Sequence, residues 1–145
     1  MKIRIEKPAP GEEEELILRC HELDRHLMKL IYTLKNAEEP LMGYLEDRIV
    51  RLSPSAIFYF EAVEGRVFAY TDKEVFEVRR KLYEIEALYG ALDFLRISKS
   101  CIVNVSKIDY VKPSFNGRFE ARLKNGETII ISRQYVAQLK KKLGI

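Results

Sequence analysis

This 145-residue sequence has few of the residues that cross-link, kink or loosen a chain. It contains two cysteines, two histidines, five prolines and seven glycines, and it lacks tryptophan. Cys20 and Cys101 lie far apart and have no histidine at ligand spacing, which argues against a disulfide framework and a structural zinc site. The low glycine and proline content argues against disorder and fibrous repeats. This cysteine usage suits a reducing cytoplasm.

Long apolar runs are also missing from the sequence. No stretch approaches the roughly 20 apolar residues of a membrane-spanning helix, and the N-terminus lacks the apolar centre and cleavage site of a signal peptide. We therefore expect a soluble, cytoplasmic protein. With 47% apolar residues, a chain of this length buries roughly two-thirds of its unfolded surface, enough for one compact domain and a short appendage.

Catalytic and metal-binding motifs are absent as well. The sequence has no phosphate loop and no GxGxxG, GxSxG or HExxH motif. His21 and His26 would lie about 140° apart around a helix axis, too far for a metal-binding pair. Cys101 lies in an apolar run and is interpreted as a core residue rather than a nucleophile. We predict a protein that is not an enzyme and that needs no metal or cofactor.

The charge of the chain is distributed unevenly. The formal net charge is +3. Residues 1–40 carry seven basic and nine acidic side chains, and residues 41–93 carry seven and ten. Residues 94–145 carry eleven and three, a net charge of +8. Such asymmetry is typical of a phosphate-binding surface, although basic residues that only solvate one end of the chain give the same balance.

Residues 1–40 have the pattern of a small β-β-α appendage. Alternating apolar and charged residues predict a strand over 1–6, and a second short strand is expected over 16–19. The leucine spacing predicts an amphipathic helix over 21–36, which Pro40 separates from the rest of the chain. This appendage either packs on the main body or mediates dimerisation.

Residues 41–145 have the rhythm of a mainly β domain with short helices, an α+β arrangement. Helices are expected over 80–89, stopped by a left-handed Gly90, and over 134–143, capped by Ser132. Asn116-Gly117 and Asn125-Gly126 predict type I′ turns. The expected strands are 41–45, 48–52, 57–63, 66–71, 74–79, 94–98, 101–105, 118–123 and 128–131.

The most informative stretch is FLRISKSCIVN, residues 94–104. Its matching positions, together with those farther on, are Phe94, Arg96, Ser98, Ser100, Val103, Asn104, Leu123, Asn125, Gly126, Ser132 and Arg133. On these residues the sequence resembles the LytTR family of bacterial DNA-binding domains. The family pattern is F-x-R-x-H/S-x-S-x-x-V-N, followed by L-x-N-G and then by S-R before a closing helix. The resemblance covers residues 44–144.

The resemblance implies a LytTR-like fold of small antiparallel sheets with short flanking helices. Such domains contact double-stranded DNA through loops inserted into successive major grooves and do not use a helix-turn-helix. They act in transcription regulation, typically on paired direct repeats. For this chain it implies a DNA-binding domain over 41–145 and a homodimer, or two copies on tandem sites.

The resemblance also implies roles for ten residues. Arg133 and Lys99 occupy positions of base or groove contacts, and the planar fork of Arg133 suits guanine O6 and N7 better. Arg66 is the expected reader in another contacting loop. Phosphate contacts are implied for Arg96, Ser98, Ser100, Asn116, Arg118, Ser132 and Gln134. For each of these residues a solvated surface position or a turn-forming role is the alternative.

Three positions or segments need separate interpretation. Asn104 fits the family pattern, but an asparagine that ends an apolar strand usually binds nearby backbone, so we predict a structural role. Ser98 stands where many members have histidine, which removes any imidazole contact. Residues 1–40 are too few for the family's usual phosphoacceptor receiver and are similar to the appendage of small stand-alone members. Those members are often encoded beside a membrane protein, which implies a functional link to one.

Other functions fit parts of the sequence. Lys140, Lys141 and Lys142 could lead the closing helix into a groove or onto an acidic membrane, although lysines in a last turn also complement the helix dipole. An RNA-binding module is an alternative, since basic β-rich domains do that work. A protein-interaction module is another, for which the acidic first 93 residues argue.

Overall fold

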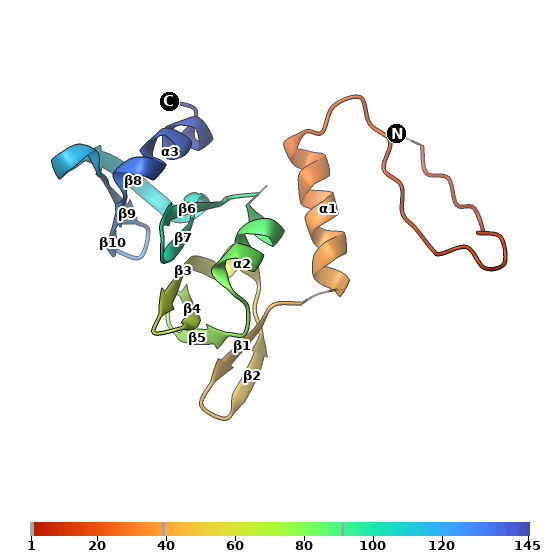
Figure 1. Cartoon of the computed structure of the whole chain (residues 1–145), viewed down its shortest axis with the longest axis horizontal. Helices are drawn as coiled ribbons and strands as arrows, with labels where there is room; N and C mark the ends of the chain where they lie inside the picture. The colour runs from red at the N-terminus through yellow and green to blue at the C-terminus, as the bar shows by residue number, and fades with distance from the viewer. Residues whose placement is uncertain (1, 39, 91) are drawn as a thin grey trace.

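Two antiparallel sheets of seven and three strands form the body of the protein in the computed structural model, which describes residues 2–38, 40–90 and 92–145 (Figure 1). The strands are β1 (Met42–Leu45), β2 (Arg48–Arg51), β3 (Ile57–Val63), β4 (Arg66–Thr71), β5 (Val75–Val78), β6 (Phe94–Ser98), β7 (Cys101–Asn104), β8 (Ile108–Pro113), β9 (Phe119–Leu123) and β10 (Thr128–Ile131). The α-helices are α1 (Arg25–Glu38), α2 (Leu82–Tyr89) and α3 (Val136–Leu143). The predicted mainly β fold with short helices is confirmed.

The seven-stranded sheet has the order β2-β1-β5-β4-β3-β7-β6 and packs one face against α2. Ile85 of α2 is fully buried there. Three aromatic rings fill the same core, because Phe60 lies 6.5 Å from Tyr89 and 5.6 Å from Phe94 between ring centroids. Such aromatic pairs contribute packing energy beyond the apolar area that they bury. This core packs β6, through Phe94, against Tyr89 of α2.

A second core joins the two sheets. The three-stranded sheet has the order β10-β9-β8, and its Leu123 packs with Val103 of β7 and Leu139 of α3. A register shift between Ile57 and Tyr59 turns part of β3 toward this second core. The bulge explains how one strand, by losing strict alternation, serves both cores.

Strand β8 was not predicted as a strand. It forms the edge of the three-stranded sheet, and most of its residues are exposed. Its sequence therefore lacks a clear apolar alternation, and Pro113 at its end is tolerated because an edge strand leaves backbone groups unpaired. Pairing with β9 alone creates this strand.

The two Asn-Gly turns differ in geometry. Asn116 and Gly117 have φ of +56° and +74°, as the predicted type I′ turn requires. In the other turn only Gly126 has a positive φ, and its N–H donates to the Leu123 carbonyl at 2.9 Å. The type I′ prediction for Asn125-Gly126 is therefore wrong, because the loop has three residues and uses the glycine as a left-handed bulge.

Two predicted helix boundaries also differ. Gly90 is right-handed, with φ of −63°, so the predicted left-handed stop is wrong. A Cβ at Gly90 would lie 2.4 Å from the Glu86 carbonyl oxygen, so this glycine provides space rather than a special φ. Ser132 precedes a 3-10 turn, η4 (Arg133–Tyr135), and makes no side-chain capping bond. Helix α3 consequently begins later than predicted, and Gly144 ends it with the expected left-handed conformation.

Residues 2–24 form an extended arm that reaches away from the body (Figure 1). The strands predicted over 1–6 and 16–19 are wrong for the described residues, and Met1 lies outside them. Ile3 and Ile5 are 89% and 91% exposed. Two extended segments without a third strand or a packed face do not make a stable sheet, which accounts for the missing strands.

Helix α1 connects the arm to the body. The Asp24 carboxylate accepts a hydrogen bond from the Leu27 N–H at 2.8 Å and so caps the helix start. Leu27 is buried and Arg25 pairs with Asp93 at 2.7 Å, while Leu30 on the same helix stays 42% exposed. Part of the predicted apolar stripe is therefore buried and part remains open. None of the described helices has the length and apolar character needed to cross a membrane.

Candidate nucleic-acid interface

Three segments that are distant in sequence meet around one hollow of about 670 Å³. They are the β6–β7 turn, the β8–β9 turn and the segment that follows β10. The lining residues are Ser98, Lys99, Ser100, Asn116, Arg118, Ser132, Arg133 and Gln134. Eight of the ten predicted site residues thus share one surface, and Arg66 and Arg96 are the two that lie outside it.

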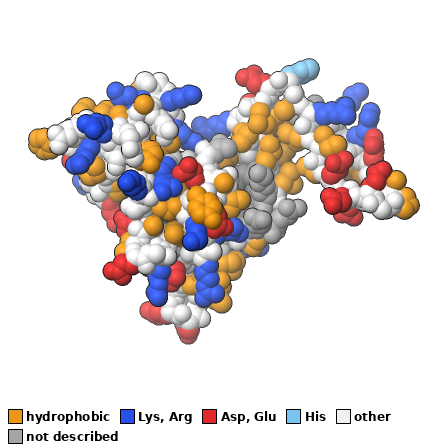
Figure 2. Space-filling view, in the orientation of Figure 1, with side chains coloured by type: hydrophobic (Ala, Val, Ile, Leu, Met, Phe, Trp, Pro, Cys, Tyr) orange, Lys and Arg blue, Asp and Glu red, His pale blue; other side chains and the backbone are white. Residues whose placement is uncertain are grey.

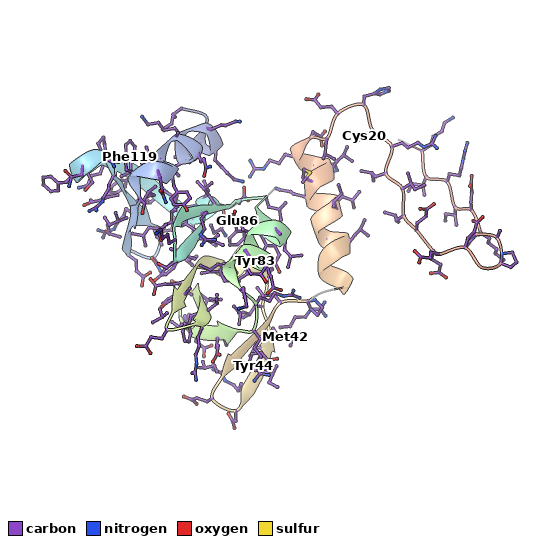
Figure 3. The ribbon with its side chains drawn as sticks, viewed as in Figure 1. Cys20, Met42, Tyr44, Tyr83, Glu86 and Phe119 are labelled. Atoms are coloured by element: carbon purple, nitrogen blue, oxygen red, sulfur yellow. The ribbon has the colours of Figure 1, made fainter. Side chains whose placement is uncertain are left out.

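Arg96 braces the β6–β7 turn from beneath. Its Nε donates to the Ser98 carbonyl at 2.8 Å and its Nη2 to the Lys99 carbonyl. Its Nη1 lies 3.2 Å from the Glu86 carboxylate on α2, the side chain labelled in Figure 3. Because these bonds occupy the guanidinium, the geometry favours a positioning role for Arg96 over the expected phosphate contact.

The β8–β9 turn is shaped to receive the side chain of Arg133. A Cβ on Gly117 would lie 3.0 Å from Arg133 Cδ and 3.1 Å from Cγ. Glycine therefore lets the aliphatic part of Arg133 lie against the turn. The Arg118 N–H donates to the Phe115 carbonyl at 3.1 Å, which closes the turn. Contact between the β8–β9 turn and the side chain of Arg133 therefore helps to position the Arg133 guanidinium.

The segment after β10 is anchored at both ends. Ile131 and Leu139 are fully buried, and the Ser132 N–H donates to the Ile97 carbonyl of β6 at 2.8 Å. The 3-10 turn between these anchors leaves Arg133 and Gln134 exposed. A polar pair is thus presented to solvent from a short, well-packed segment.

The hollow is electropositive. Lys99, Arg118 and Arg133 line it and no carboxylate does. Within the described residues none of the three forms an ion pair, in contrast to Arg25 and Arg48 elsewhere. Figure 2 shows several Lys and Arg side chains over the part of the molecule formed by the three-stranded sheet and α3. Cations without carboxylate partners remain available to an anionic ligand.

Arg66 stands apart from the hollow, at the same end of the large sheet. It follows the Glu64-Gly65 turn, and its Nη1 lies 4.0 Å from the Glu77 carboxylate. The Ala62 N–H donates to the Ser100 carbonyl at 2.8 Å, so the β3–β4 and β6–β7 turns are neighbours. Arg66 is therefore placed near one side of the interface.

Asn104 and Cys101 have the structural roles that were predicted. Asn104 is 2% exposed; its Nδ2 donates to the Ile57 carbonyl at 2.9 Å and its Oδ1 accepts from the Ser106 N–H at 3.1 Å. Cys101 is buried, and burial raises the pKa of its thiol to about 12. A thiol that stays protonated is a poor nucleophile. Across the described ranges no cluster of potential metal ligands occurs.

Phe115 is a feature of this surface that the sequence interpretation missed. It lies in the β8–β9 turn beside the hollow and is 85% exposed. The available signal was an aromatic residue directly before Asn-Gly, in a turn where small polar residues are usual. The exposure of a turn residue depends on the packing around the turn, which the pattern of neighbouring residues in the sequence does not reveal.

The fold and this surface define a class of β-rich DNA-binding domains. The family model for the LytTr DNA-binding domain matches residues 47–144, so the chain belongs to the LytTR family. A solved LytTr DNA-binding domain from Bacillus cereus superimposes with a TM-score of 0.69 at 25% identity, covering 74% of this chain and 99% of that one. The resemblance inferred from the motifs is confirmed.

Two relatives show how the chain compares in length. The sensory transduction protein LytT of Enterococcus faecalis is 32% identical over 111 residues, and the match covers 77% of this chain and 45% of that protein. An uncharacterized HTH-type transcriptional regulator of Staphylococcus aureus strain MSSA476 is 27% identical over 147 residues, covering 100% and 99%. The chain thus spans under half of the first relative and nearly all of the second.

Proposed function

We propose that this protein regulates transcription by binding double-stranded DNA sequence-specifically, with the hollow facing a major groove. The observation that carries this proposal is the convergence of three turns around one hollow with three cations and no carboxylate. Phosphates supply most non-specific affinity, and donors held at fixed positions add base discrimination. Because the partner is DNA, the protein acts in the cytoplasm of a bacterial cell.

Each lining residue has a role that suits its chemistry. Arg133 donates two hydrogen bonds to guanine O6 and N7, a pairing that discriminates by ~1 to 3 kcal/mol. Lys99 makes a second groove contact as a point charge, and Arg66 makes a contact from the adjacent turn. Phosphate contacts are assigned to the remaining residues that line the hollow, which are five uncharged polar residues and one arginine: Ser98, Ser100, Asn116, Ser132, Gln134 and Arg118. They hold the register of the protein on the duplex.

Duplex DNA fits this surface better than RNA does. The DNA major groove admits a two-stranded β-ribbon, whereas the major groove of A-form RNA is too narrow to be read. Phe58, Phe60 and Phe76 are buried, so they provide no stacking platform for single strands. The closing helix is also unsuited to lead, because Lys142 is half-buried and donates to the Gly90 carbonyl at 3.1 Å. No two of the described α-helices follow one another along the chain, so a helix-turn-helix is not the reading element.

A selection experiment tests the proposal. The full chain is incubated with fragmented bacterial genomic DNA, and retained fragments are sequenced. We expect enrichment of a motif in paired direct repeats, and a log-log salt slope of affinity of about −4 to −5 for about five basic groups of the cationic last third that neutralise phosphates. Single-stranded RNA should compete poorly. Retention of no fragment, or better competition by RNA than by duplex DNA, would contradict the proposal.

We propose further that the arm and α1 mediate a homodimer. The family match covers residues 47–144 and so leaves residues 1–40 outside the matched DNA-binding domain. The arm has a basic segment, 2–8, with Lys2, Arg4 and Lys7, and an acidic segment, 12–15, of four glutamates. Reciprocal antiparallel pairing between two arms brings opposite charges together and covers the exposed isoleucines, as a two-fold interface requires.

Light scattering on the full chain tests this assembly, with a dimer as the expected result. A monomer at all concentrations would contradict it, without affecting the assignment of DNA binding. The functional link to a membrane protein that the family resemblance implies stays a prediction.

A further inference from the structure

The side chain of Phe115 is almost entirely exposed to solvent, which is unusual for a residue of this size and apolar character. At 85% exposure it is the most exposed large apolar side chain in residues 40–90 and 92–145. Single exposed apolar residues are common on protein surfaces and need no explanation by themselves. The position of this one, between β8 and the Asn-Gly turn that borders the hollow, gives it significance.

The backbone around Phe115 is well constrained. The Ser114 N–H donates to the Arg118 carbonyl at 2.8 Å, and the Arg118 N–H donates back to the Phe115 carbonyl. Asn116 and Gly117 complete the turn with two left-handed residues. Gly117 in turn contacts the methylenes of Arg133. The phenyl ring therefore projects from a turn whose position is coupled to the proposed guanine reader.

The neighbours of the ring are groups that suit a nucleic acid. Asn116 and Arg118 line the hollow on one side of the turn. On β8 the ammonium group of Lys112 lies 3.5 Å from the carboxylate of Glu120 on β9, so a cation partly neutralises the negative charge of this carboxylate. A phenyl ring offers neither a donor nor an acceptor to phosphate, so its ligand must present apolar surface beside the charges.

On the basis of the DNA-binding function above, we propose that Phe115 packs against the 5-methyl groups of thymine in the major groove. The major groove admits a two-stranded β-ribbon, and the thymine methyl is the apolar group that the base edges present there. Phe115 then selects thymine at base pairs adjacent to those read by Arg133. An apolar wedge between stacked bases is a feature of minor-groove binders, whereas a methyl contact requires only that the ring lies against a base edge of the major groove that the hollow is proposed to face.

Uracil, which lacks only the 5-methyl group, provides the test. Duplexes selected from a random-sequence library by the full wild-type chain are synthesised either with thymine or with uracil. Dissociation constants are measured for wild type, Phe115→Ala and Phe115→Leu by fluorescence anisotropy. Tyr83→Ala is the matched control, because Tyr83 is 67% exposed on α2, away from the turn (Figure 3).

We expect wild type to bind the uracil duplex about fourfold more weakly for each methyl group contacted. Phe115→Ala should show the same loss on thymine DNA and no further loss on uracil DNA. Phe115→Leu should retain part of the discrimination, and Tyr83→Ala should match wild type. Since the ring is exposed, its removal should leave folding intact, which circular dichroism checks.

Two results would overturn the inference while leaving DNA binding in place. One is wild-type affinity in Phe115→Ala. The other is an additional, undiminished loss on uracil DNA in Phe115→Ala, which would mean that another group senses the methyl. Failure of the wild-type chain to bind any selected duplex would instead overturn the proposed function itself.

Discussion

The hollow and the arm are both exposed and both charged, yet they differ in what lies beneath them. Behind the hollow, Ile97 and Ile131 are at most 1% exposed, and the Ser132 N–H ties the segment after β10 to the Ile97 carbonyl of β6. The arm has no buried residue within 2–17, and its turn is closed by one backbone bond, from the Glu12 N–H to the Ala9 carbonyl at 3.0 Å. A charged surface becomes a defined site only where a core fixes its backbone.

The two cysteines offer the largest measurable contrast between these regions. Cys20 is exposed at the end of the arm, near α1 in Figure 3, while Cys101 is buried in the body. With its pKa raised from 9.0 to about 12, the Cys101 thiolate is about a thousandfold rarer at pH 8 than that of an unperturbed thiol. We expect a thiol reagent to label one cysteine rapidly and the second only after denaturation.

The same pKa shift has a consequence for stability. The unfolded thiol ionises above pH 9, while the folded one stays protonated up to about 12, so the free energy of unfolding should fall as pH rises through that window. Cys101→Ala should reduce this fall. Equal labelling rates for both thiols in the native protein would mean that the second core opens readily.

The second prediction concerns Arg133 in the hollow. Replacement by alanine should weaken binding to a selected site by about 1 to 3 kcal/mol and remove preference at the base pair that it reads. Lys140→Ala is the charge-matched control, because the Lys140 ammonium lies 5.3 Å from the Phe119 ring and Lys140 does not line the hollow. Gel shifts on specific and scrambled duplexes check both variants. Similar behaviour of the two would argue against a specific role for Arg133.

The third prediction tests whether the turn positions Arg133. Gly117→Ala and Gly144→Ala both place a side chain at a positive φ, of +74° and +77°, and each should cost about 1 to 2 kcal/mol of stability. Only at Gly117 would the added Cβ meet Arg133, since nothing lies within 4 Å at Gly144. We expect thermal denaturation to show similar losses and DNA binding to fall only for Gly117→Ala. Unchanged DNA binding by Gly117→Ala would show that the β8–β9 turn does not position Arg133.

The smallest effect on folding is expected in the arm. The double substitution Ile3→Lys and Ile5→Lys should leave the melting temperature of the body unchanged, because both side chains are about nine-tenths exposed. It should shift the light-scattering mass from dimer to monomer. Ile49→Lys is the control, since Ile49 is 65% exposed on β2, outside the arm and α1. A lower melting temperature with no change in mass would show that the arm packs on its own body.

Several elements could be predicted from the sequence because their determinants are local. Strands β3, β4, β6 and β10 begin and end at the predicted residues, since alternation and flanking turn residues act over a few positions. A strand was predicted over 16–19, where none forms, and none was predicted at the edge strand β8, and both errors have the same reason. Whether an extended segment becomes a strand depends on a partner that pattern does not reveal.

The candidate site shows the same division. Motif spacing selected eight residues of one hollow, yet the bonds that occupy Arg96 and the exposure of Phe115 depend on backbone positions set by distant segments. Such contacts are tertiary, so each residue's neighbours could not be derived from its own surroundings in the sequence.

The sequence by itself determined that this is a mainly β domain with a basic last third and a set of LytTR motifs, because periodicity, charge and spacing are properties of the chain alone. Only the tertiary structure decided which cations stand free, which one braces a turn, and where the aromatic tip projects. Those outcomes follow from packing between segments tens of residues apart, where burial and hydrogen bonding assign each side chain its surroundings.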